Sequence, residues 1–167
     1  SYSLLTSGFT FCWDSKVLRS LLTITAVNGF FHMGVFIVAL PILVKTIYRG
    51  DVELFSFLQG LFTVGMLLSA LIIIYRKKLE GPGRRMIFSI LYSGLILLGL
   101  SAGPTVTGLL FLVFLWGIVV GISATLGRSI LQSSTDPEYM GRVISIYQLT
   151  LFGFAPLGAI CAGIAIS

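Results

Sequence analysis

Charged residues are scarce in this chain. Asp, Glu, Lys and Arg make up 10% of its 167 residues, whereas hydrophobic residues make up 56%. An ordinary soluble domain carries about a quarter charged residues. The apolar residues also fall into blocks of the length that crosses a hydrocarbon core of about 30 Å as a helix of roughly 20 residues. The composition therefore excludes a soluble domain and predicts an all-α membrane protein.

Histidine and cysteine are scarce as well, with one His and two Cys in the whole chain. His32 alone cannot make a histidine cluster, and Cys12 and Cys161 lack the spacing of metal ligands, so we expect neither a metal nor another cofactor. Neither Gly-x-Ser-x-Gly nor His-Glu-x-x-His occurs, and no acidic residue lies in an apolar block beside His32. We therefore expect that the chain is not an enzyme.

Five apolar blocks predict a polytopic helix bundle. Its transmembrane helices are expected over about residues 20–44, 54–75, 86–102, 106–131 and 143–166, within a membrane domain that covers 20–167. Residues 1–19 mix aromatic, aliphatic and charged side chains, which is typical of a segment at the membrane interface. The first block exceeds the hydrocarbon thickness, which predicts a tilt or a kink near Pro41. Before the last block, Thr135, Asp136 and Pro137 predict the start of a short helix.

The basic residues indicate an orientation in the membrane. Nine of the eleven Lys and Arg residues lie before the first block, between the second and third, or around the link between the fourth and fifth. The other two, Lys45 and Arg49, lie on the opposite side. The positive-inside rule then predicts a cytoplasmic N-terminus for this chain. The net charge of +5 thus reports topology, and we expect the lipid bilayer and not nucleic acid as its surroundings.

Two polar residues interrupt the first block. Asn28 and His32 are four residues apart, which places them on one helical face near the middle of the span. Polar and ionisable groups are costly at that depth and are candidates for a substrate or proton pathway. The alternative is that both side chains form hydrogen bonds with neighbouring helices and only hold the bundle together.

Small residues recur at four-residue spacing in the last two blocks. The rows contain Gly117 and Gly121 in the fourth block and Ala155, Ala159 and Gly163 in the fifth. Small side chains let helix backbones approach closely in lipid. We therefore predict that both rows pack against neighbouring helices.

Two links between the blocks resemble a known family. One runs from Leu131-Gln132 through Pro137-Glu138 to Gly141-Arg142-Val143, followed by Pro156-Leu157-Gly158 and Gly163. The other, residues 76–85, resembles the signature Gly-x-x-x-Asp-Arg-x-Gly-Arg-Arg, with Arg76 in place of the first Gly and Gly81 in place of the first Arg. On these residues the chain resembles the major facilitator superfamily, in the drug and siderophore exporter branch that includes the enterobactin exporter and macrolide efflux proteins. The similarity extends over nearly the whole chain, as helices seven to eleven of a twelve-helix transporter.

The resemblance implies a function and a set of partners. Such exporters are proton antiporters of the bacterial inner membrane that move an amphipathic small molecule, a drug or a siderophore, by rocking two halves about a midplane site. Gly83, Arg84 and Arg85 match the signature and Glu80 stands for its acid, which implies a cytoplasmic gating clamp with Arg142 near it. The chain would be a fragment whose partner is the missing N-terminal half of the same transporter. The alternative function is a non-transporting scaffold or assembly subunit that binds partner helices.

Overall fold

The structure is a computed structural model that describes residues 9–75 and 81–166. Within these ranges every regular element is a helix, and five helices are long and apolar enough to cross a membrane. The elements are α2 (Lys16–Asn28), the π-helix η1 (Gly29–Met33), α3 (Gly34–Thr46), α4 (Val52–Tyr75), α5 (Pro82–Ser101), α6 (Val106–Ser133) and α7 (Met140–Ile166). α2, η1 and α3 follow one another without a break and form the first span, Lys16–Thr46. The predicted all-α architecture with five membrane-spanning helices is confirmed.

The helices extend beyond several of the predicted limits. The first begins at Lys16, α5 begins at Pro82 and α7 begins at Met140, each three or four residues before the expected position. Hydropathy marks only the part of a helix that lies in hydrocarbon, whereas hydrogen bonding continues into the polar flanks. Local signals set these starts: the Ser15 hydroxyl accepts from Leu18 N at 3.4 Å, and Pro82 occupies the first turn of α5.

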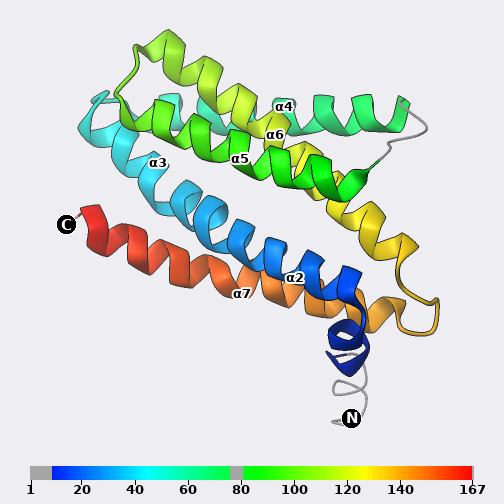
Figure 1. Ribbon diagram of the computed structural model, residues 1–167. Helices are drawn as coiled ribbons and strands as arrows, with labels where there is room; N and C mark the ends of the chain where they lie inside the picture. Colours follow the sequence, from blue (N-terminus) through cyan, green and yellow to red (C-terminus); the bar gives the residue numbers. More distant parts are fainter. Residues whose placement is uncertain (1–8, 76–80, 167) are drawn as a thin grey trace. The chain divides into compact units, whose positions relative to one another are not determined.

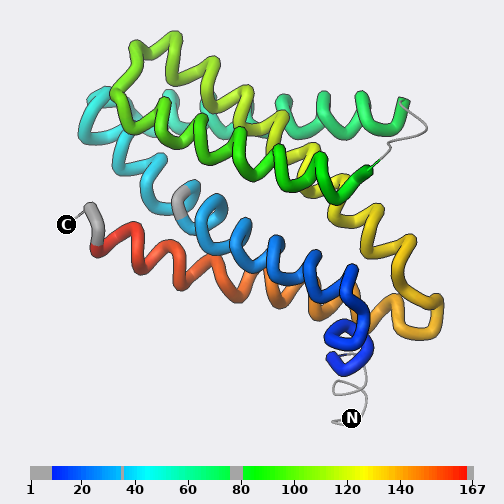
Figure 2. The backbone as a smooth tube through the Cα atoms, viewed as in Figure 1, coloured from blue at the N-terminus to red at the C-terminus, as the bar shows by residue number. Residues whose placement is uncertain are grey.

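The chain divides into two compact units. Unit 1 consists of Ser1–Leu40 and Gly127–Ser167, and unit 2 consists of Pro41–Leu126. Figures 1 and 2 show the course of the helices in each.

In unit 1, α7 packs along η1 and α2. The contact is made by backbone atoms at glycine positions. A Cβ atom at Gly34 would lie 2.6 Å from Ala159 N, one at Gly158 would lie 2.7 Å from the carbonyl carbon of Phe30, and one at Gly29 would lie 3.2 Å from the carbonyl carbon of Leu151. Any side chain at these glycines would overlap the facing helix. The absence of side chains therefore lets the two backbones touch.

The π-helical turn gives unit 1 its contact face. The Gly34 N–H donates to Gly29 O, an i to i+5 bond. In an α-helix of 3.6 residues per turn, residues five apart point in different directions. The wider turn places Gly34 above Gly29, so that both glycines face α7. The change of helix type in the first span therefore lies at Gly29–Met33, whereas Pro41, near which a kink was predicted, lies within α3.

In unit 2, α6 packs against α4 in the same manner. A Cβ at Gly117 would lie 2.9 Å from the carbonyl carbon of Phe62, and one at Gly121 would lie 2.8 Å from Met66 Cα. On α4, a Cβ at Gly65 would lie 2.9 Å from Ile118 N. The predicted small-residue row of the fourth block thus lies in a helix contact.

The row predicted in the last helix follows this pattern only in part. Ala155 is buried, and Ala159 contacts Gly34 as described above. A Cβ at Gly163 would meet nothing within 4 Å. Gly158, which lies between the positions of the predicted row, makes the contact with Phe30 of η1.

The prediction of a short helix before the last span is wrong. Residues 137–139 form a turn instead, in which Tyr139 N donates to Asp136 O at 3.0 Å and Met140 N to Pro137 O at 3.4 Å. The Thr135 hydroxyl donates back to Leu131 O at 2.7 Å. Thr135 therefore satisfies a carbonyl at the end of α6 and does not cap a new helix.

We predict that Gly117→Ala destabilises the protein and that Gly60→Ala does not. The new methyl group at residue 117 overlaps the α4 backbone, and overpacking of this kind costs about 1–3 kcal/mol. A Cβ at Gly60, on α4 itself, meets nothing within 4 Å, so this variant controls for the helix propensity of alanine. The measurement is thermal unfolding in detergent micelles. Equal melting temperatures for the two variants would contradict the contact.

Candidate functional site

The π-helical turn in unit 1 holds the chain's single histidine. His32 is 7% exposed and lies in η1, near the middle of the 31-residue first span. Asn28 is half-buried and is the last residue of α2, directly before the turn. The four-residue spacing of Asn28 and His32 predicted that both side chains lie on one face of an α-helix. Because the π turn begins between the two residues, this spacing no longer determines the relative direction of their side chains. Of the two, His32 is the more deeply buried.

A second polar cluster lies in unit 1 and was not identified from the sequence. Thr25 is fully buried and donates its hydroxyl to Leu21 O at 2.8 Å. A side-chain hydrogen bond joins Thr25 to Tyr147, which is 7% exposed, and the charge of Arg128 acts on Tyr147. The cluster thus connects α2, α7 and α6.

A cavity of about 220 Å³ opens beside this cluster. Its lining residues come from α6 and α7, and they are Arg128, Leu131, Gln132, Ile144, Tyr147 and Gln148. The only sequence signal was the presence of polar residues near the ends of two apolar blocks. Such residues commonly reach toward the membrane interface, which is why the sequence alone did not mark them as a site.

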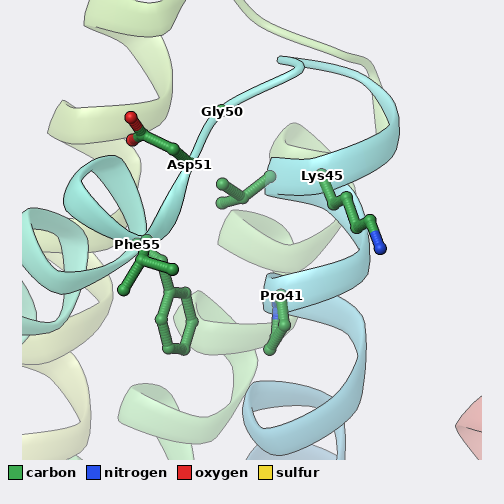
Figure 3. Close-up of a pocket in the computed structure, with 7 residues that line it drawn as sticks. Pro41, Lys45, Gly50, Asp51 and Phe55 are labelled. Carbon is green, nitrogen blue, oxygen red and sulfur yellow. The ribbon is translucent and has the colours of Figure 1, made fainter.

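Unit 2 contains a larger cavity of about 400 Å³ between α3 and α4 (Figure 3). Pro41, Val44 and Phe55 contribute apolar surface, and Lys45 and Asp51 carry its charges. In Figure 3 the Asp51 carboxylate and the Lys45 ammonium point away from each other, with Phe55 and Pro41 below them. Asp51 also caps α4, because its Oδ1 accepts from Glu53 N at 3.1 Å and from Leu54 N at 3.2 Å. Asp51 therefore has a structural role at this cavity.

The link between α3 and α4 is closed by one strained residue. Arg49 has φ = 47°, and Gly50 N donates to Val44 O at 3.0 Å. Glycine is the usual residue at a positive φ, because it has no Cβ atom to clash with the backbone. Arginine at this position fixes the turn at some cost in backbone strain.

The residues of the predicted gating clamp belong to different parts of the chain. Glu80 lies outside the described residues. Gly83 and Arg84 are in the first turn of α5 in unit 2, where the Arg84 guanidinium lies 5.5 Å from the centre of the Phe88 ring, and Arg85 beside them is exposed. Arg142 is in unit 1, with its guanidinium 5.4 Å from the centre of the Tyr139 ring. Arg84 and Arg142 thus each contact an aromatic ring within their own unit.

The residues before the first span are attached to the start of α7. Residues 9–14 are helical, and the Phe11 ring stacks on Tyr139 with centroids 4.6 Å apart and an interplanar angle of 3°. Cys12 is 1% exposed, and burial raises the pKa of its thiol. Phe9 and Trp13 stack on each other but remain more than half exposed. The segment thus has one side bound to unit 1 and one aromatic side open to its surroundings.

Among residues 9–75 and 81–166, no group of three or more His, Cys, Asp or Glu side chains is placed to hold a metal ion. Comparisons of the chain with protein-family models, with curated proteins and with solved structures found no match. The candidate site therefore rests on the geometry of unit 1 alone.

We predict that Cys12 reacts slowly with a water-soluble maleimide at pH 7 and that Tyr139→Ala accelerates the reaction. The thiolate is the reactive species, and burial both covers the thiol and disfavours its ionisation. Loss of the Phe11–Tyr139 stack should release the segment. The experiment uses a Cys161→Ser background, and the reference is Trp13→Cys in a chain without the native cysteines, because Trp13 is 57% exposed. Equal labelling of Cys12 and the residue-13 thiol would show that the segment is not packed.

Proposed function

We propose that this chain is part of a secondary active transporter of the bacterial inner membrane, one that exports an amphipathic small molecule in exchange for protons. One observation carries the proposal, namely the buried His32 in a π-helical turn at the middle of a membrane span. Ionisable residues at that depth are rare, and they mark substrate or ion pathways. The resemblance to the major facilitator superfamily supports the same reading.

The irregular helix supports transport in a second way. Binding sites of secondary transporters lie near the bilayer midplane and are commonly formed by interrupted helices. π-helical turns are also frequent at functional sites. In this chain the interruption is bounded by Gly29 and Gly34 and is packed against the α7 backbone. The backbones of η1 and α7 therefore meet directly beside His32.

Proton exchange is then the role proposed for His32. Imidazole is the side chain whose unperturbed pKa lies closest to physiological pH. Alternating access exposes one midplane group to each side of the membrane in turn. His32 would take up a proton from the outer side and release it to the cytoplasm, while Asn28 offers a hydrogen-bonding group at the edge of the same turn.

The proposed orientation places the N-terminus of the chain in the cytoplasm. The basic residues of the links then face the cytoplasm, where Arg84, Arg85 and Arg142 would contribute with Glu80 to closing the pathway. The missing N-terminal half of the transporter would supply the opposing wall of the substrate site at the midplane of the membrane. Alternating access needs both halves, so the function belongs to the longer protein.

A scaffold function receives less support. Its main sequence argument was the pair Gly117 and Gly121, which would offer a surface to partner helices. In unit 2 both residues instead face α4 of the same chain. The row is therefore occupied within the chain, which favours the transporter.

We expect His32→Ala to abolish the pH dependence of export by the full-length protein and to lower its rate severely. His32→Gln should behave similarly, because glutamine retains hydrogen bonding but cannot exchange a proton. Phe31→Leu is the matched control, since Phe31 adjoins His32 in η1 and is 55% exposed. The measurement is export of a fluorescent amphipathic substrate from cells or proteoliposomes at several pH values. Full export with unchanged pH dependence in His32→Gln would remove His32 from the coupling mechanism.

A further inference from the structure

We propose that the cavity lined by α6 and α7 in unit 1 is a binding site for the anionic group, a carboxylate or phosphate, of an amphipathic molecule. The cavity is bounded by two matching sets of residues. Arg128, Leu131 and Gln132 lie on α6, and Ile144, Tyr147 and Gln148 lie on α7. Each set has the spacing i, i+3, i+4, which defines one face of an α-helix. The two faces meet across the cavity, so its lining follows from regular helix geometry.

The hydrogen-bonding groups of the lining suit an anion. Arg128 offers up to five N–H donors and a permanent positive charge, and the Gln132 and Gln148 carboxamides offer further donors. None of the described residues that line the cavity is Asp or Glu. Guanidinium groups match carboxylate and phosphate oxygens in a two-point geometry. A cationic ligand would meet the charge of Arg128 with no described carboxylate in the lining to offset it.

Among the residues that the structure describes, Arg128 forms no ion pair with a carboxylate. Arg128 lies inside α6, five residues before its end at Ser133, or about 8 Å along the axis at 1.5 Å per residue. Arg128 and Gln132 are exposed and Gln148 is half-buried, and all three line the cavity.

The wall opposite Arg128 is held in place from behind. A side-chain hydrogen bond joins Tyr147 to Thr25, and Thr25 donates to Leu21 O at 2.8 Å. Tyr147 is therefore a positioning residue, which its bond to α2 holds at that wall of the cavity.

The size and apolar parts of the cavity indicate an amphiphile. Its volume is about 220 Å³, compared with about 30 Å³ for a water molecule in the liquid. This space holds a carboxylate or phosphate with a few attached carbons. Leu131 is buried at one side, whereas Ile144 is 38% exposed. A longer apolar tail would leave the cavity along Ile144. A membrane lipid and a free anionic amphiphile share this chemistry.

The test is direct binding of dodecyl phosphate to the purified full-length protein in nanodiscs of phosphatidylcholine. We expect Arg128→Gln to weaken binding about tenfold or more, consistent with loss of a charge-assisted hydrogen bond. Arg128→Lys should bind with intermediate affinity, and Gln132→Leu combined with Gln148→Leu should weaken binding while leaving the charge intact. Arg19→Gln is the matched control, because it removes one exposed positive charge of unit 1 outside the cavity. Equal weakening by Arg19→Gln and Arg128→Gln, or wild-type binding by both Arg128 variants, would overturn the site.

Phosphatidylglycerol in the nanodiscs distinguishes the two sources of the ligand. If the natural ligand is a membrane lipid, phosphatidylglycerol should compete with dodecyl phosphate in the wild type, and less of it should co-purify with Arg128→Gln. If the ligand is a free amphiphile, dodecyl phosphate should bind equally well in both lipid compositions. Binding is measured without transport, so loss of the proposed proton coupling through His32 would leave this result unaffected. The melting temperature of each variant controls for folding.

Discussion

The contact between the backbones of η1 and α7 is the constraint on which the arrangement of unit 1 depends. In lipid, helices gain nothing from hiding apolar side chains from each other, so close packing and polar bonds must hold them together. Glycines at positions 29, 34 and 158 remove the side chains that would separate the two backbones. The π turn brings the first two of these glycines to one side. His32, which lies within that turn, is buried as a consequence of the same geometry.

The polar groups of unit 1 are arranged along the same helix pair. A side-chain hydrogen bond between Thr25 and Tyr147 joins α2 to α7, and Arg128 of α6 lines the same cavity as Tyr147. Each polar group removed from water requires a partner in its place, so this bond also fixes how α7 is rotated about its axis. The cavity with its donor groups and the histidine turn therefore share one structural element, α7.

The number and approximate limits of the helices could be predicted because hydropathy and helix length determine them directly. The π turn could not, since Gly29 and Gly34 flank it in a pattern that is equally compatible with an α-helix. Thr135 was misread because the same residue types cap the start of a helix and bond back to the end of one, and only the backbone conformation decides between them. Arg128, Gln132 and Gln148 were missed as a site because their meeting depends on how α6 and α7 pack, which the spacing within either helix does not contain.

Solid-state NMR of the full-length protein in lipid bilayers measures directly whether the α7 backbone touches the π-helical turn. With carbon-13 in Phe and Gly, we expect a through-space cross-peak between the Phe30 carbonyl carbon and the Gly158 α carbon. Helices separated by ordinary side chains lie about 8–10 Å apart between their axes, and their backbone carbons would give no such peak. Absence of the Phe30–Gly158 peak in a spectrum that resolves both residues would contradict the contact and the placement of His32 that follows from it.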